Sequence, residues 1–164
     1  MTELEKKGIY ACALPMPGFD NPSSPEWINE IKRYVEQDTD DEIYLVGHSL
    51  GSTSILRYLE NPDKRFNVSG AVLISTPTEK TVNKNLDSFF EHPFDFKSIK
   101  SNCKSFSIIH GDNDTHVSIN EGINLAKALE TSLIIIPNGG HLSGREGWYS
   151  LPQCLEALMK IFQT

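Results

Sequence analysis

A serine between two glycines is the first part of this sequence that could do chemistry. Ser49 stands in Gly47-His48-Ser49-Leu50-Gly51, between an apolar run and a segment with helical character. A G-x-S-x-G pattern in that context is typical of a nucleophile elbow, a strained turn that exposes the Ser hydroxyl, with both glycines leaving room beside it. The backbone amide of Leu50 would then point to where a tetrahedral oxyanion forms. The alternative is an ordinary Gly-rich turn in which Ser49 only caps the helix.

A Ser hydroxyl is a weak nucleophile without a base, and two later loops supply a base and an acid. His141 ends a loop after one apolar run, and Asp112 and Asp114 lie in a loop after another. The order Ser, acid, His is the order found in hydrolases that use such an elbow. Either carboxylate could reach the imidazole; we favour Asp114 because it lies three residues before Val117 and just before an expected helix, with Asp112 bracing the loop. The pattern predicts Ser49 as nucleophile, His141 as general base and Asp114 as the acid that orients it.

The other histidines have less specific interpretations. His110 and His116 lie close to the two aspartates in sequence, but the spacing matches neither an EF-hand loop nor H-E-x-x-H. We therefore expect no metal site and no cofactor. His110 ends an apolar run and is expected to be a core histidine. His48 is more readily explained by packing under the elbow than by service as the base.

Aromatic residues are dense in an otherwise polar stretch at 77–100. Its four phenylalanines could line an acyl pocket beneath a lid, or they could anchor the stretch to the rest of the domain, and we weigh the two alternatives evenly. The candidate substrate-binding residues are two of these phenylalanines together with side chains near the proposed nucleophile and base: Phe89, Phe90, His48 and Trp148.

The elements that must position these groups follow from the apolar pattern, in which short apolar runs alternate with helical segments. The expected strands cover 9–14, 43–46, 71–74, 106–109 and 133–136, and the expected helices cover 25–37, 52–59, 119–130 and 152–162. Because the apolar runs are continuous, the strands should be buried on both faces, which indicates a mainly parallel sheet flanked by helices. The chain is expected to form a single α/β domain over 1–164, with 77–100 as a small lid or helical excursion.

Composition narrows the range of partners. Asp and Glu number 22 against 15 Lys and Arg, giving a net charge of −7, which argues against nucleic acid or an anionic membrane surface. The three cysteines are widely spaced and form no C-x-x-C pair, as expected for reduced thiols in a cytoplasmic protein. The charged start has no signal-peptide pattern. We expect a small-molecule acyl substrate as the partner, and no pattern indicates an oligomeric state.

Several motifs resemble the small serine hydrolases similar to retinoblastoma-binding protein nine, within the α/β-hydrolase superfamily. They run through most of the chain: Leu-Val-Gly-His-Ser-Leu-Gly with Leu56-Arg-Tyr-Leu59, Val72-Leu-Ile-Ser75, Phe94-Asp-Phe-Lys-Ser-Ile99, Gly111-Asp-Asn-Asp114 and Asn138-Gly-Gly-His141. The resemblance implies a compact α/β-hydrolase with a minimal lid that hydrolyses small carboxylic esters or related acyl compounds. Carried over position by position, it implies Ser49, Asp114 and His141 as the triad.

The sequence departs from this family at its start. Family members begin with a strand, a turn and a helix ahead of the strand that matches 9–14, whereas this chain opens at Glu3-Leu-Glu-Lys-Lys-Gly8. We therefore expect an N-terminally truncated α/β-hydrolase fold, with an unpaired edge or a rearranged pairing where that strand would lie. The missing turn normally supplies a second oxyanion amide, and losing one such donor costs about a hundred- to a thousandfold in rate. The hypotheses are a serine hydrolase impaired by the missing strand and, as the alternative, a catalytically weak binding protein of the same fold.

Overall fold

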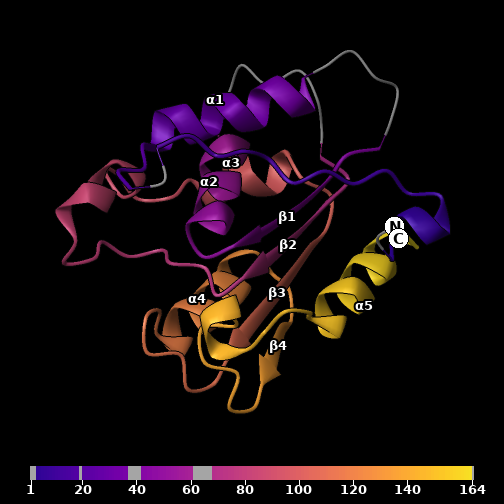
Figure 1. The fold of residues 1–164 in the computed structure, drawn as a ribbon. Coiled ribbons are helices and arrows are strands. Elements are labelled where there is room, and N and C mark those ends of the chain that lie inside the picture. Colours follow the sequence, from indigo (N-terminus) through magenta and orange to yellow (C-terminus); the bar gives the residue numbers. More distant parts are fainter. Residues whose placement is uncertain (1–2, 19, 37–41, 61–67, 164) are drawn as a thin grey trace.

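A four-stranded parallel sheet organises the molecule (Figure 1). The computed structural model describes residues 3–18, 20–36, 42–60 and 68–163. The strands, in the order in which they lie in the sheet, are β1 (Tyr44–His48), β2 (Gly70–Ile74), β3 (Phe106–Gly111) and β4 (Leu133–Ile136). Because all neighbours are parallel, the carboxyl ends of the strands, and the loops that follow them, meet at one edge.

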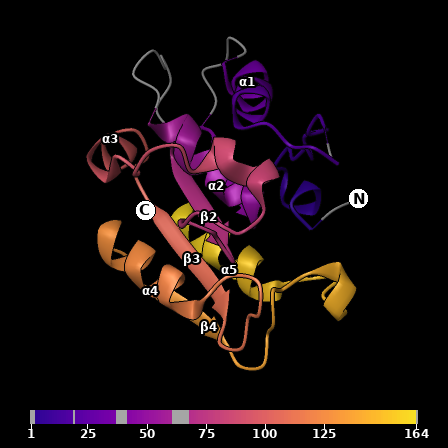
Figure 2. The ribbon, with the colours of Figure 1, turned by 90° about the vertical axis from the view of Figure 1, so that its left-hand side faces the viewer.

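Helices cover both faces of this sheet (Figures 1 and 2). One face packs against α2 (Leu50–Leu59), α3 (Phe96–Ser101) and α4 (Ile119–Ala128), and α1 (Ser24–Val35) lies on α2. The other face packs against α5 (Pro152–Ile161). Three short 3-10 turns complete the described elements: η1 (Glu5–Lys7), η2 (Lys84–Phe89) and η3 (Gly144–Glu146).

The helices lie close to their expected ranges, for local reasons. Pro25, in the first turn of α1, has no amide hydrogen to leave unsatisfied. The side chain of Ser118 accepts a hydrogen bond from the Asn120 amide and so caps α4. The expected end of the first long helix, at Gln37, lies outside the described residues. Within the described part of the chain, none of the helices has the length and apolar character that crossing a bilayer requires.

The strands are not equally buried, although their sequences are similarly apolar. Every residue of β2 is buried, from Gly70 to Ile74. In β1, by contrast, Val46 keeps 48% of its surface exposed, and in β4 Ile135 keeps 49%. The expectation that 43–46 forms a strand buried on both faces is therefore wrong as to burial. Among the described strands β1 pairs only with β2, and it forms one edge of the sheet.

The stretch 9–14 does not form a strand, contrary to expectation. Most of its residues are exposed, Tyr10 to 87%, and only Leu14 packs against the core. In Figure 1 this indigo segment crosses above β1 without joining the sheet. A run of β-prone residues becomes a strand only where a neighbouring strand takes its backbone hydrogen bonds, and none of the described strands lies beside this one.

The stretch 77–100 contains η2 and most of α3 and is anchored to the helical layer. Phe89 is fully buried and meets the Trp27 ring edge to face at 5.5 Å. Arg57, itself buried, donates from Nε to the Phe89 carbonyl at 2.9 Å and places its guanidinium 3.7 Å from the centre of the Phe94 ring. A buried cation that is both hydrogen-bonded and stacked holds this excursion on α2. Its service as a lid stays a prediction.

Candidate active site

Ser49 lies in a strained turn at the carboxyl end of β1. Its φ is 54° and its ψ −127°, a conformation that a side-chain-bearing residue adopts only when its surroundings enforce it. One constraint is the hydrogen bond from its amide to the Ile74 carbonyl of β2, 2.9 Å long. A second is the close approach at Gly47, where a Cβ would come within 2.6 Å of the Ser52 amide nitrogen. A Cβ at Gly51 would meet nothing within 4 Å, so the expected need for both glycines holds for Gly47 only.

The side chains of three distant loops form one hydrogen-bonded chain. Nε2 of His141 lies 3.0 Å from Oγ of Ser49, and Nδ1 of His141 lies 2.8 Å from Oδ2 of Asp114. The other carboxylate oxygen of Asp114 accepts hydrogen bonds from the amides of His116 and Val117, at 2.8 and 3.0 Å. The carboxylate is thus fully buried yet has a donor at each oxygen.

The electrostatics of Asp114 follow from that environment. Burial raises the pKa of this carboxyl, but the hydrogen bonds from the Val117 amide and the His141 ring outweigh it and hold the pKa below its usual value. Asp114 is therefore a carboxylate at neutral pH. It can hold the Nδ1 proton of His141 and leave Nε2 free to accept a proton from Ser49.

Asp112 is placed differently from Asp114. It is exposed, and its Oδ1 accepts a hydrogen bond from the Asn138 amide at 2.7 Å. The neighbouring Asn113 accepts one from the Gly140 amide, also at 2.7 Å. These bonds tie the loop after β3 to the loop after β4. The carboxyl group that contacts the imidazole of His141 is therefore that of Asp114, and Asp112 braces the loop.

The backbone of His141 is also hydrogen-bonded to side chains. Its amide donates to Oε1 of Glu146 at 3.0 Å, and its carbonyl accepts from Nε2 of His48 at 2.7 Å. Glu146 additionally accepts from the amide and hydroxyl of Ser143, and the hydrogen bond from the His141 amide is the main cause of its lowered pKa. Sequence reasoning missed Glu146, although Ser143-x-x-Glu146 has the spacing of a capping box.

Three histidine rings lie together at this point. The ring of His48 is centred 4.8 Å from that of His141, and the ring of His116 lies 5.0 Å away. Partial burial lowers the pKa of His48, so this ring is neutral at pH 7. His110 is fully buried, as expected of a core histidine, and its Nε2 donates to the Val117 carbonyl at 3.0 Å.

The remaining predicted site residues are the oxyanion donor Leu50 and the candidate substrate-binding residues Phe89, Phe90 and Trp148. Leu50 is the first residue of α2, so its amide has no acceptor within the helix and is available to an oxyanion. The burial of Phe89 against Trp27 favours anchoring over substrate contact. Phe90 lies beside Phe89, with the ring centres 6.4 Å apart. Trp148 is half-buried against the core on the α5 face of the sheet.

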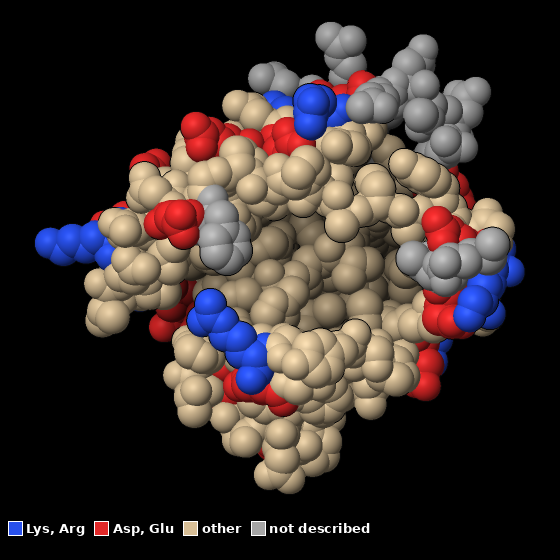
Figure 3. Space-filling model, in the orientation of Figure 1, with Lys and Arg blue, Asp and Glu red and all other residues tan. Residues whose placement is uncertain are grey.

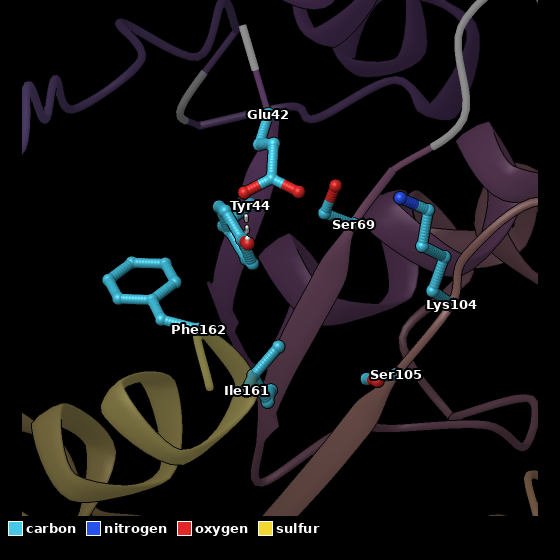
Figure 4. A pocket seen from close by; sticks show the side chains of 7 residues that line it. All are labelled: Glu42, Tyr44, Ser69, Lys104, Ser105, Ile161 and Phe162. Atoms are coloured by element: carbon cyan, nitrogen blue, oxygen red, sulfur yellow. Dashed lines mark hydrogen bonds between the residues drawn. The ribbon is translucent and has the colours of Figure 1, made fainter. Parts of the chain in front are cut away.

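A metal cluster and a second pocket are the other kinds of site to consider in the described residues. Among them no cluster of His, Cys, Asp and Glu side chains could hold a metal ion. A pocket of about 300 Å³ lies between the end of α5 and the sheet (Figure 4). It is lined by Tyr44, Ser69 and Ser105, at the amino ends of three strands. The pocket is thus at the opposite end of the sheet from Ser49 and from the loops that carry Asp114 and His141.

Comparison with known proteins gives consistent matches over most of the chain. The family described as "Serine hydrolase" matches residues 3–160. YdeN of Bacillus subtilis (strain 168), named as a candidate hydrolase, is 30% identical over 156 residues, which cover 94% of this chain and 82% of YdeN. The serine hydrolase RBBP9 of Rattus norvegicus is 25% identical over 141 residues, or 85% of this chain and 73% of RBBP9.

Solved structures agree with these matches. The crystal structure of the Bacillus subtilis ydeN gene product superposes with a TM-score of 0.90 at 30% identity, over 98% of this chain and 87% of that one. Est1E from Butyrivibrio proteoclasticus superposes with a TM-score of 0.62 at 16% identity, over 89% and 74% of the two chains. At that identity the likeness concerns the fold alone.

Proposed function

The chain belongs to the serine hydrolase family, with an α/β-hydrolase fold, and on that premise we propose that it cleaves small carboxylic esters or related acyl compounds through an acyl-enzyme on Ser49. The observation that supports these catalytic residues is the unbroken path from Ser49 Oγ through the two ring nitrogens of His141 to Asp114, in steps of 3.0 and 2.8 Å. Both distances lie within hydrogen-bond range, as proton transfer requires.

The proposed reaction has two halves that share one base. Ser49 Oγ attacks the acyl carbon while its proton passes to Nε2 of His141, and the Leu50 amide donates to the oxyanion that forms. His141 then gives the proton to the departing alcohol, leaving the acyl group on Ser49. A water molecule, deprotonated by His141, attacks the acyl carbon and releases the acid, and the proton returns to Ser49. Asp114 keeps the ring in the required tautomer throughout.

The surface near β1 supports an uncharged substrate. The face shown in Figure 3 is hollowed over β1, and the visible walls of the hollow carry no Lys, Arg, Asp or Glu among the described residues, whereas charged side chains lie on its rim. β1 leads directly to Ser49. An apolar acyl group that enters such a hollow would displace water from apolar and uncharged walls, and the charged side chains on the rim would keep their hydration.

Labelling with a fluorophosphonate probe tests the proposal. We expect stoichiometric labelling of the wild-type protein at Ser49 and hydrolysis of p-nitrophenyl acetate, both abolished in Ser49→Ala. His141→Ala should lower the rates of both by at least about a thousandfold, because the hydroxyl loses its base. Ser54→Ala is a matched control, because that hydroxyl lies in α2 and bonds to the Leu50 carbonyl. Labelling that persists in Ser49→Ala would contradict the assignment of the nucleophile.

A second candidate is a catalytically weak binding protein of the same fold. The observation that favours it is the edge of β1, which no other described strand pairs with and where Val46 is exposed to 48%, because sheet edges bind extended partner strands. The same labelling experiment separates the two functions: folded protein that reacts with no fluorophosphonate and hydrolyses no ester would favour the binding protein.

We further propose that the protein works in the cytoplasm on a small-molecule substrate, without nucleic acid or membrane as partner. The net charge of −7 and the wide spacing of the three cysteines support this. Fractionation of the source cells, followed by fluorophosphonate labelling of each fraction, tests it. Activity confined to a membrane fraction would contradict the proposal.

A further inference from the structure

We propose that His48 and Glu146 are positioning residues that hold the backbone of His141 from its two sides and so keep the imidazole in line with Ser49. The inference rests on the proposed hydrolase function, because it gives two residues a role in positioning the proposed base, His141. Neither residue lies in the path from Ser49 to Asp114, and each acts through His141.

Glu146 holds the amide side of His141. Its Oε1 accepts the His141 amide at 3.0 Å, and its Oε2 accepts the Ser143 amide and hydroxyl at 3.2 and 2.9 Å. A Cβ at Gly140 would lie 2.5 Å from Oε1 of Glu146, so the carboxylate is packed directly against the turn. A carboxylate that accepts from the His141 amide and from two donors of Ser143 holds together the backbone of this part of the loop.

His48 holds the carbonyl side. Because a carbonyl oxygen only accepts, Nε2 of His48 is the donor in the 2.7 Å contact with the His141 carbonyl. His48 directly precedes Ser49 in the chain, so this one hydrogen bond joins the nucleophile elbow to the loop that carries the base. The distance between Ser49 Oγ and His141 Nε2 is therefore restrained twice. One restraint is the hydrogen bond between these two atoms, and the other is the hydrogen bond from His48 to the His141 carbonyl.

The backbone around His141 needs such restraint. Gly140 has a φ of 59° and Leu142 a φ of 52°, so the base lies between two left-handed residues. A left-handed leucine is strained and persists only where other contacts impose it. Asp114 contacts the imidazole of His141 and so orients the ring, but that contact does not fix the backbone of His141. Asp112 and Asn113 bond to the backbone of Asn138 and Gly140, whereas His48 and Glu146 bond to the backbone of His141 itself.

Paired substitutions test the proposal, because one variant of each pair removes the donor or acceptor and the other keeps it. His48→Phe keeps a ring and loses the donor, whereas His48→Gln keeps an N–H donor at a similar reach. Glu146→Ala removes the acceptor, and Glu146→Gln keeps one. His116→Phe is the control, because that ring lies at nearly the same distance from His141 as His48 does, and no hydrogen bond joins the two side chains in the described structure.

We expect kcat to fall in the variants that lose the hydrogen bond and to recover in those that keep it. His48→Phe and Glu146→Ala should each lower kcat for p-nitrophenyl acetate by about ten- to a hundredfold with little change in KM, as misplacement of a catalytic group does. His48→Gln and Glu146→Gln should recover most of that loss, and His116→Phe should lose much less. In the double variant His48→Phe/Glu146→Ala the losses should not multiply, because both act on one backbone. Wild-type kcat in both single variants would overturn the proposal.

A second readout does not depend on catalysis. The Nδ1 proton of His141, held by Asp114, should give a downfield proton NMR resonance that disappears in His141→Ala. We expect this resonance to persist in His48→Gln and to broaden in His48→Phe and Glu146→Ala, with thermal unfolding showing that the variants are folded. Wild-type protein that hydrolyses no ester would refute the proposed function while leaving this measurement to decide the positioning role. An unchanged resonance in both loss variants would refute the positioning role alone.

Discussion

The loop that carries His141 and the edge formed by β1 meet at Ser49, but they are held in very different ways. The His141 loop is bonded to the loop after β3 through Asp112, Asn113 and Asp114. β1 pairs, within the part of the chain that the structure describes, with β2 and with no strand on its other side. One contributor to the proposed relay is thus enclosed by its neighbours, and the other stands at a sheet edge.

The positions of Ser49, Asp114 and His141 depend on the pairing of the four strands. The amide of Ser49 bonds to β2, and the acid and base follow β3 and β4. The three side chains are therefore set by the pairing from β1 to β4, without any contribution from the open side of β1.

The largest expected effect comes from the acid that the two loops enclose. Asp114→Asn should lower kcat/KM for p-nitrophenyl acetate by about ten-thousandfold, because an amide at this place favours the wrong imidazole tautomer. Asp112→Asn, which keeps an oxygen for the Asn138 amide, should lower it by less than about tenfold. Steady-state kinetics on the two variants decide between them. Equal losses would mean that the acid is shared or misassigned.

A smaller effect is expected where the two loops touch. A Cβ on Gly111 would come within 2.1 Å of the Gly140 carbonyl oxygen, so Gly111→Ala must push the His141 loop away. We expect a loss of about a hundredfold in kcat, the scale of a 1 Å misplacement, and a lower Tm. Gly51→Ala is the counterpart beside β1, where nothing lies within 4 Å of the added Cβ, and its Tm should be at least that of the wild type. A Gly111→Ala protein with wild-type kcat would show that the loops are not tightly coupled.

Much of this arrangement could be predicted from the sequence because its signals are local. The order of strands and helices follows from apolar periodicity, and β4 covers the expected 133–136. The association of Ser49, Asp114 and His141 follows from their places after parallel strands, whose carboxyl ends share an edge. The preference for Asp114 over Asp112 as the partner of the imidazole came from its spacing to Val117, whose amide does bond to that carboxylate.

What the sequence could not supply were properties that depend on distant neighbours. The run at 9–14 has strand-like composition, yet whether it pairs depends on a strand beside it, and none of the described strands lies there. The exposure of Val46 depends on what covers β1, which its own sequence does not encode. The bond from His48 to the His141 carbonyl joins residues 93 positions apart, and no local pattern reports it.

The smallest expected effect compares the edge with the centre of the sheet at one pair of residues. Val46 of β1 and Val72 of β2 are register partners, so their side chains lie on the same face. Val72 is fully buried, whereas Val46 is 48% exposed. Val72→Ala should lower the free energy of unfolding by about 2 kcal/mol, since it removes buried methyl groups and leaves a cavity. Val46→Ala should lower it by less than about 1 kcal/mol. Urea unfolding followed by circular dichroism measures both, and equal losses would mean that in solution the open side of β1 is covered, for instance by a second copy of the chain.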